Sequence, residues 1–293
     1  MIPRAGQGKV QDMKRREDLE WRRFTAAGFP VIGAVLLMLA APDLMADGPT
    51  AAAAAAYNAY VSKVEARLDE QHGQQQASAG GFLASEDWAR LRKGELIIDQ
   101  ITPVMGAELP GALLHDWRGT AFIAGAKGAD FEKLMRDFSG YPKTYAPEVL
   151  TARVLAHDGD HYQVTMRVRQ QHVLTVVMDT AYDVRFGNGE STEAAAQRGY
   201  STTRSTSIAE IDWPGTTDER ALSPAEANGF LWRLNTYWSY EERDGGLYIQ
   251  IESVSLSRSI PVGLGWAVAP FIESVPREAL EFTLRATSNA LQK

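Results

Sequence analysis

Ionisable residues at several places in the sequence are of the types that metal or acid–base chemistry requires, so their spacing decides whether they could carry it out. The run His157–His161 (His-Asp-Gly-Asp-His) has metal-ligand residue types, but its spacing matches none of the usual zinc or calcium patterns, and its Asp-Gly pair favours a hairpin turn. His115, Asp116 and Arg118 lie together in an expected strand. Alternation places His115 on the face opposite the other two, which argues against a His–Asp dyad. The sequence therefore predicts no metal and no other cofactor.

Glu252 is the remaining candidate for acid–base work, because neither face of the strand expected over residues 247–259 is cleanly apolar. An inward Glu252 beside an inward arginine such as Arg204 would form an ion pair able to orient the polar head of a ligand. The alternative is that both side chains are outward and solvated, since charged residues are rarely buried.

The strand expected over residues 230–242 carries the clearest binding signal, an aromatic and aliphatic face with a two-residue period. We expect this face to point inward, where its side chains either contact a ligand in an apolar cavity or fill that space as core. The candidate ligand-binding residues on it are Trp232, Leu234, Trp238 and Tyr240.

The elements that must position these residues follow from hydrophobic period and turn residues. Hairpin connections imply an antiparallel sheet, and a long terminal helix, opened by Ser274-Val275-Pro276, must cover its apolar face. We predict an α+β, helix-grip fold in which a curved antiparallel sheet of about six to seven strands wraps around the C-terminal helix. The expected strands span residues 112–123, 149–155, 162–169, 173–186, 200–211, 230–242 and 247–259, with a further strand-forming segment at 96–101 and a helix from Asp130.

Two stretches resemble the START/polyketide-cyclase-type (SRPBCC) helix-grip superfamily. One is Pro261–Thr287, near the end of the chain, and the other is Phe131–Tyr145, with its run Leu-Met-Arg-Asp-Phe-Ser-Gly-Tyr-Pro-Lys-Thr-Tyr. The resemblance covers about residues 111–292 and implies that a ligand occupies the space between the sheet and the terminal helix. Because that superfamily holds lipid carriers, hormone receptors, aromatases, cyclases and oxygenase subunits, the resemblance bears on fold far more than on chemistry.

The composition limits the classes of function. The 293-residue chain is 45% hydrophobic and 23% charged, has no cysteine and carries a net charge of −7. These values are typical of a folded globular protein, and the lack of cysteine excludes disulfides, thiolate metal sites and a thiol nucleophile. The acidic balance argues against a nucleic-acid partner.

Residues 1–46 differ in character from the rest of the chain. A basic segment precedes the uncharged stretch Phe24–Ala41, and the small residue Ala46 follows at a plausible cleavage point. These are the parts of an export signal, with an uncleaved membrane anchor through residues 24–41 as the alternative. We therefore expect an exported protein, periplasmic or extracellular, that is attached to the membrane if the segment is retained.

The exported part divides into two regions. Residues 47–81 comprise a helix that begins near Thr50 and has one apolar face, followed by the Gly/Gln-rich linker Gly73–Gly81. Residues 82–293 contain no further break and form the START-like domain. The helix either packs on that domain or serves as a stalk, and we expect packing because a lone helix of this length gains little stability in water.

Three functions are compatible with these patterns. The first is an exported binding protein that holds a hydrophobic small molecule or lipid between the sheet and the terminal helix. The second is a cyclase or dehydratase that uses the same pocket with Glu252 as its acid–base residue. The third is a structural envelope protein whose core is filled. The aromatic strand face favours the first function, because it provides the apolar lining that a ligand pocket needs. The sequence also contains no recognisable catalytic site.

Overall fold

The computed structural model describes residues 48–73, 83, 87–101, 109, 111–171, 175–188, 197–259 and 265–292, without the side chains of 265–273. One compact unit comprises Met45–Ser259 and Ile272–Lys293, and the architecture below is that of this unit. The other unit comprises Met1–Leu44 and Ile260–Phe271, of which only helical backbone from Gly265 on is described. The predicted export signal or anchor at residues 1–46 and most of the predicted linker lie outside the described residues.

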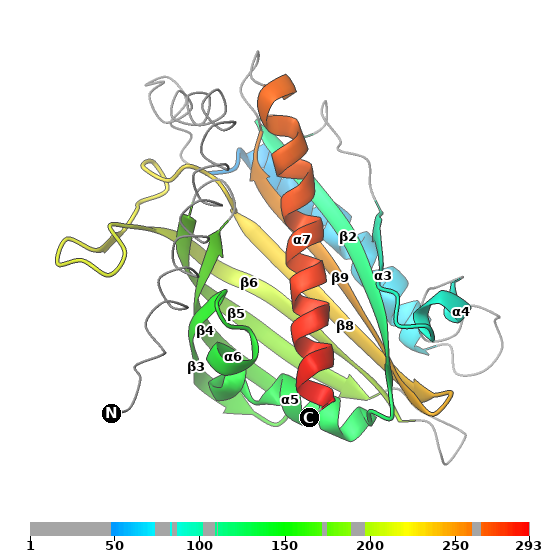
Figure 1. The fold of residues 1–293 in the computed structure, drawn as a ribbon. Coiled ribbons are helices and arrows are strands. Elements are labelled where there is room, and N and C mark those ends of the chain that lie inside the picture. Colours follow the sequence, from blue (N-terminus) through cyan, green and yellow to red (C-terminus); the bar gives the residue numbers. More distant parts are fainter. Residues whose placement is uncertain are drawn as a thin grey trace, which may run out of the picture. The chain divides into compact units, whose positions relative to one another are not determined.

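A nine-stranded antiparallel sheet forms the body of this unit (Figure 1). The strand order is β1-β2-β9-β8-β6-β5-β4-β3, and the short β7 pairs with β6. The predicted α+β class with an antiparallel sheet is thus confirmed, with two more strands than the predicted upper number. The strands are β1 (Ile97–Gln100), β2 (Ala112–Ala124), β3 (Val149–Asp158), β4 (His161–Gln171), β5 (Thr175–Asn188), β6 (Arg198–Asp212), β7 (Arg220–Ala221), β8 (Arg233–Arg243) and β9 (Gly246–Arg258).

Tight turns connect the long strands where the sequence predicts them. Asp244 and Gly245, between β8 and β9, have φ angles of 55° and 75°, and Gly159, between β3 and β4, has 56°. Two successive positive φ angles match the twist of the flanking strands, and aspartate and glycine adopt them most readily. These turns fix the strand register and therefore which side chains share a face.

The C-terminal helix α7 spans Gly265–Leu291, and its part in this unit, from Ile272 on, lies across one face of the sheet (Figure 1). We call this the inner face. The helix α5 (Gly128–Arg136) packs on it as well. The period of the helix predicts an inward stripe of Leu280, Leu284, Thr287 and Leu291. The first three are at most 4% exposed, and Leu291 is partly buried against the same core.

The start of α7 differs from the prediction. The helix begins at Gly265, so Pro276 lies within it rather than at its first turn. Proline has no amide hydrogen, so one backbone hydrogen bond is missing there, and the Ser-Val-Pro pattern looks like a helix start because that loss costs nothing at a first turn. Farther along, a Cβ on Gly119 of β2 would lie 2.7 Å from Leu284 Cδ1. Glycine at this position lets α7 contact the sheet closely.

The opposite, outer face is covered by α3 (Ala51–Gly73), which lies behind the sheet in Figure 1. The packing expected for this helix is confirmed. Apolar side chains that recur every three or four residues along α3 contact β2, β8 and β9. The buried residues of this contact include Tyr57, Val61, Val64 and Leu68 on α3, and Leu114, Tyr237, Val254 and Leu256 on the sheet.

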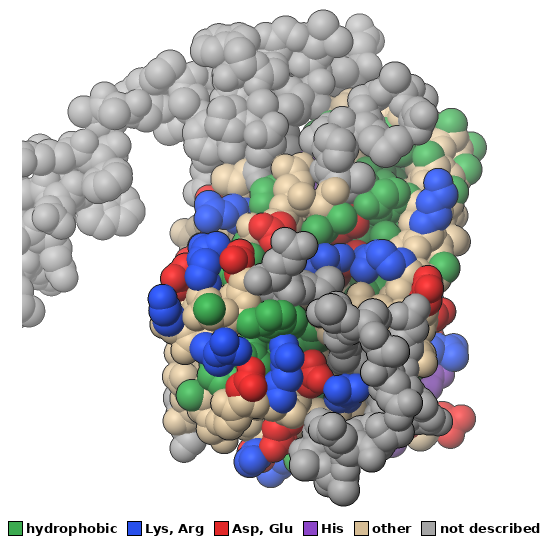
Figure 2. All heavy atoms as spheres, turned by 90° about the vertical axis from the view of Figure 1, so that its right-hand side faces the viewer, with side chains coloured by type: hydrophobic (Ala, Val, Ile, Leu, Met, Phe, Trp, Pro, Cys, Tyr) green, Lys and Arg blue, Asp and Glu red, His purple; other side chains and the backbone are tan. Residues whose placement is uncertain are grey.

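The surface on the side of α4 (Trp88–Leu91) and β1 carries both signs of charge. Figure 2 shows basic and acidic side chains interspersed there, so the described surface on this side has no extended patch of one sign. Among the described helices, none combines the length and apolar content needed to span a bilayer.

Candidate functional site

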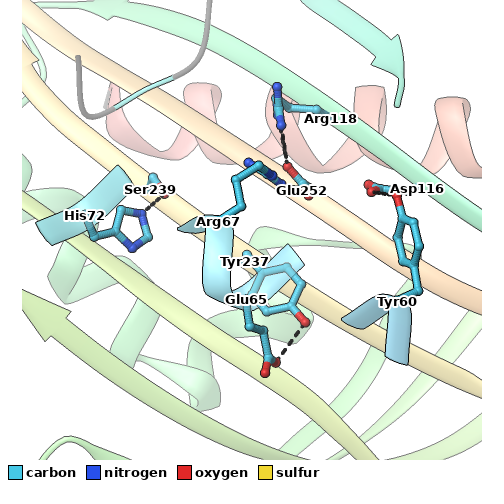
Figure 3. Close-up of polar contacts among 9 residues, drawn as sticks. All are labelled: Tyr60, Glu65, Arg67, His72, Asp116, Arg118, Tyr237, Ser239 and Glu252. Carbon is cyan, nitrogen blue, oxygen red and sulfur yellow. Dashed lines mark hydrogen bonds and ion pairs between the residues drawn. The ribbon is translucent and has the colours of Figure 1, made fainter. Parts of the chain in front are cut away.

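Charged side chains form a cluster on the outer face, under α3, with Glu252 of β9 at its centre (Figure 3). Glu252 is only 2% exposed. It accepts hydrogen bonds from Arg118 of β2, 3.0 Å from Nε and 2.8 Å from Nη2, and from Arg67 of α3. A buried carboxylate is tolerated when charged donors compensate it, so the two guanidinium groups both neutralise Glu252 and hold α3 against the sheet.

Asp116 lies in the same cluster and is 0% exposed. Tyr60 Oη of α3 donates a hydrogen bond to Oδ2 at 2.7 Å, whereas Oδ1 has no partner among the described residues. Burial, reinforced by the negative charge of Glu252, raises the pKa of Asp116 to about 7. This carboxyl is therefore partly protonated near neutral pH.

A second contact fastens the middle of α3 to the sheet (Figure 3). Glu65 accepts a hydrogen bond from Arg204 Nε of β6 at 2.6 Å and another from Tyr237 Oη of β8 at 3.0 Å. Both partners project from the outer face, so the ion pair ties α3 to two neighbouring strands.

A third contact lies at the C-terminal end of α3. His72 Nε2 is 2.8 Å from Ser239 Oγ, and the imidazole ring stacks on Tyr200 with 4.2 Å between ring centroids. Burial lowers the pKa of His72 to about 4, and the positive charge of Arg67 contributes in the same direction. The docked helix thus holds a neutral imidazole at neutral pH.

The inward pairing of Glu252 with Arg204 considered above is not what the structure shows. Glu252 pairs with Arg67 and Arg118, and Arg204 pairs with Glu65. Both side chains lie on the outer face, yet the solvated alternative fails for Glu252 as well, because α3 covers it. The mixed alternation of β9 has a physical reason: 10 of its 13 residues are buried because both faces of the strand are covered.

Trp238 and Tyr240 point to the inner face, as predicted, and belong to its filled core. The Phe131 ring of α5 lies 5.5 Å from Trp238 and 5.2 Å from Tyr240, centroid to centroid. Leu280 and Leu284 of α7 complete the same cluster. Side chains fill this end of the inner face.

Beyond this core, the rest of the protein covers the inner face only in part, and apolar side chains there are partly exposed. The strand register places Leu234 on the same face as Trp238, at the other end of β8. Met178 of β5, on the same face, is 0% exposed, but several other apolar side chains of this face are, like Leu234, neither fully buried nor fully exposed. These residues are Leu113 on β2, Met166 and Val168 on β4, Val176 on β5 and Ile208 on β6. We call this set, with Leu234, the open inner surface.

Trp232 does not share the face of Leu234. It precedes the first residue of β8 and packs, partly buried, on the outer-face cluster that includes Leu256. Strand alternation does not extend to a residue outside the strand, so the two-residue period placed this side chain on the wrong face.

Sequence reasoning missed Trp117, which lies on the inner face of β2 at the border of the open inner surface. The signal was present: the alternation that separates His115 from Asp116 and Arg118 also puts Trp117 on the inner side. No cluster of three or more His, Asp or Glu side chains suited to a metal ion occurs in the described part of the chain.

Comparison with known proteins gives a likeness of fold. No family model matches the chain, and no curated protein matches it in sequence. Similar solved structures include a STAR-related lipid transfer protein from Xanthomonas axonopodis (15% identity, 67% of this chain and 99% of that one, TM-score 0.39). Others are a START superfamily protein from Mycobacterium smegmatis (15%, 60% and 97%, 0.39) and the Zhui aromatase/cyclase from Streptomyces sp. R1128 (12%, 61% and 94%, 0.39).

Identities and TM-scores this low tell nothing about ligand or reaction. The fold assignment therefore depends on the strand order, the hairpin connections and the position of α7 described above. In these respects the chain has the α+β, helix-grip arrangement that the sequence predicted.

Proposed function

We propose that the protein binds a hydrophobic small molecule or lipid on the open inner surface, between the sheet and α7. The observation that carries this proposal is the incomplete cover of apolar side chains that face inward. Packed cores leave few such side chains in contact with solvent, and partly exposed apolar surface in a concave site is typical of ligand-binding proteins. Leu234 and Val176 are two members of this surface, near the ends of β8 and β5.

The two other functions receive less support. A cyclase or dehydratase with Glu252 as acid–base residue would need that side chain to reach the ligand, and Glu252 lies on the outer face beneath α3. A purely structural role would need the inner face to be filled throughout, as it is around Trp238.

A pair of adjacent substitutions tests the proposal. Leu234→Trp adds volume to the open inner surface, whereas Arg233→Trp adds the same ring to the exposed outer side of the same strand. We expect native mass spectrometry of the protein from its own host to detect a bound hydrophobic molecule in the parent and in Arg233→Trp, and not in Leu234→Trp. A parent protein that is free of ligand and binds no hydrophobic probe would refute the proposal and favour the structural role.

We also propose that residues 1–46 direct export. The support is the basic segment followed by the uncharged stretch Phe24–Ala41. Sequencing the N-terminus of the protein recovered from separated cell fractions tests this: a start near Asp47 in a periplasmic or extracellular fraction indicates a cleaved signal. Met1 or its neighbour in a membrane fraction indicates an anchor, and a full-length chain in the cytoplasm would refute export.

A further inference from the structure

The indole N–H of Trp117, on the inner face of β2, is a buried hydrogen-bond donor without an acceptor in the described part of the chain. The side chain is 8% exposed, and its Nε1 has no hydrogen-bond partner among the described residues. Leaving such a group unpaired costs on the order of 1–3 kcal/mol, so native proteins rarely tolerate it without a reason. A partner that is absent from the polypeptide is one such reason.

The neighbours of Trp117 across the sheet are polar as well. The strand register places Ser253 of β9, Thr236 of β8 and Thr203 of β6 in one row with Trp117 on the inner face. The next row toward the C-terminus of α7 is closed, because Leu284 lies over Gly119. The row on the other side of Trp117 holds the buried His115 and Ser255 and, on β8, the partly exposed Leu234. The row of hydroxyl and N–H groups therefore lies between the filled core and Leu234.

The charges of the inner face are already compensated. The register turns Glu210 of β6 and Glu242 of β8 inward. Glu210 accepts backbone hydrogen bonds from Gly229 and Phe230 at 2.9 and 3.1 Å, and Glu242 accepts from Lys127 Nζ at 2.7 Å. Of the lysines and arginines on the described strands, the register turns only Arg220 of β7 inward. Its carboxylate partners Asp212 and Glu226 already neutralise it, so none of these cations is left for an anionic ligand.

We infer that the open inner surface takes a neutral, largely apolar ligand that carries a carbonyl-type acceptor, hydrogen-bonded by Trp117 Nε1. This inference rests on the proposed binding function and sharpens it. It separates ketones, esters and quinones from pure hydrocarbons, which offer no acceptor. It also separates them from free fatty acids, whose carboxylate would be buried without a cation. Trp117 is then a specificity-determining residue.

Matched probes test the inference on the full chain. 9-Fluorenone and fluorene share one ring skeleton and differ by a carbonyl, and 2-tridecanone and tridecane form an open-chain pair. In equilibrium dialysis we expect the parent protein to bind the ketone of at least one pair about tenfold more tightly than its hydrocarbon, as one satisfied buried donor implies. Laurate at pH 8 should bind more weakly than the open-chain ketone.

Trp117→Phe removes the N–H and keeps an aromatic ring. We expect it to abolish the preference for the ketone while the affinity for the hydrocarbon stays within about twofold, since apolar contact is retained. Trp213→Phe, at a tryptophan that is 63% exposed, serves as the matched control and should keep the preference. Should Trp117→Phe fold poorly, the indole N–H resonances of the parent give a second measurement: fluorenone should shift one of them downfield and fluorene should not.

The possible outcomes separate the two proposals. Equal binding of ketone and hydrocarbon by the parent, or an unchanged preference in Trp117→Phe, overturns the inference and leaves the binding function standing. Tighter binding of laurate than of the ketone also overturns it. If neither pair binds, the proposed function itself fails, and the inference fails with it.

Discussion

The two faces of the central strands β2, β8 and β9 are held by different physical means. The inner face meets α7 and α5 through aromatic and aliphatic side chains, among them Trp238, Ile251 and Leu284. The outer face meets α3 through an apolar stripe and also through buried charges, with Glu252 and Asp116 at their centre. Hydrophobic contact is tolerant of small displacements, whereas an ion pair has one geometry. We conclude that apolar contact stabilises both faces and that the charges of the outer face in addition specify how α3 is seated.

The largest expected effect comes from the inner face. Leu284→Ala removes a side chain that is 0% exposed, at the point where α7 contacts Gly119. We expect a loss of about 3–5 kcal/mol in the free energy of unfolding, since the close contact leaves a cavity that the structure cannot close. Urea denaturation measures it. Arg285→Ala, next to it on the exposed side of α7, should change stability by less than about 0.5 kcal/mol. An equal effect of the two would mean that α7 is not what holds the inner face.

Glu252→Ala should have the next largest effect, and a more local one. It leaves Arg118, whose side chain is 16% exposed, without its counter-charge, and removes the partner of Arg67. We expect a loss of about 3 kcal/mol, because a broken buried pair leaves an uncompensated charge. Hydrogen exchange should show that amides of α3 lose protection while those of α7 keep it.

The matched control for that change is Glu281→Ala. Glu281 pairs with Arg285 on the surface of α7, where the side chains are 38% and 63% exposed. A solvated pair of this kind contributes less than about 1 kcal/mol. If both substitutions cost the same, or if Glu252→Ala loosens α7 as much as α3, the buried charges do not serve to seat α3.

Much of the fold was predictable from local pattern. The strands, the Asp244-Gly245 turn and the helix beginning near Thr50 are set by residue period and turn chemistry, which act over a few neighbours. The face on which Glu252 lies was not predictable in the same way. Its strand is covered on both sides, so the period that distinguishes inside from outside is missing. Its partner Arg67 lies 185 residues away in sequence, and no local pattern connects the two.

The candidate site was predictable only in part. Leu234, Trp238 and Tyr240 point inward as alternation predicts, but alternation cannot tell a filled core from an open surface. That distinction depends on which parts of the sheet the side chains of α5 and α7 reach, and this is set by tertiary packing. The unpaired donor of Trp117 is likewise visible only once its surroundings are known.

Asp116→Asn tests the charge of the outer face through its dependence on pH. The pKa of Asp116 is about 7 in the folded protein and about 3.9 in an unfolded chain, so ionisation penalises the folded state. The parent therefore loses stability as pH rises from about 4 to about 7, and the full penalty applies above that range. We expect Asp116→Asn to be more stable than the parent at pH 8, on the order of 2 kcal/mol, and about equal to it at pH 4. A parallel pH profile of the two proteins would show that Asp116 does not titrate in this window.

His72→Gln should have the smallest effect and the opposite sign. The pKa of His72 is about 4 in the folded protein and about 6.5 in an unfolded chain, so the parent loses stability as pH falls from about 6.5 to about 4. Glutamine keeps a hydrogen bond to Ser239 and does not titrate. We expect this variant to gain on the order of 1 kcal/mol relative to the parent between pH 7 and pH 4.5, measured by urea denaturation across that range. Because Asp116 and His72 act in opposite directions over overlapping pH ranges, the contribution of His72 offsets part of the loss of stability that Asp116 causes in the parent. Each single substitution therefore leaves the slope of the other residue. Combining the two substitutions should remove both contributions and leave the slope of groups elsewhere, such as Glu148, whose pKa burial raises to about 7. If Glu148→Gln in the double variant leaves that slope unchanged, another group titrates in this range.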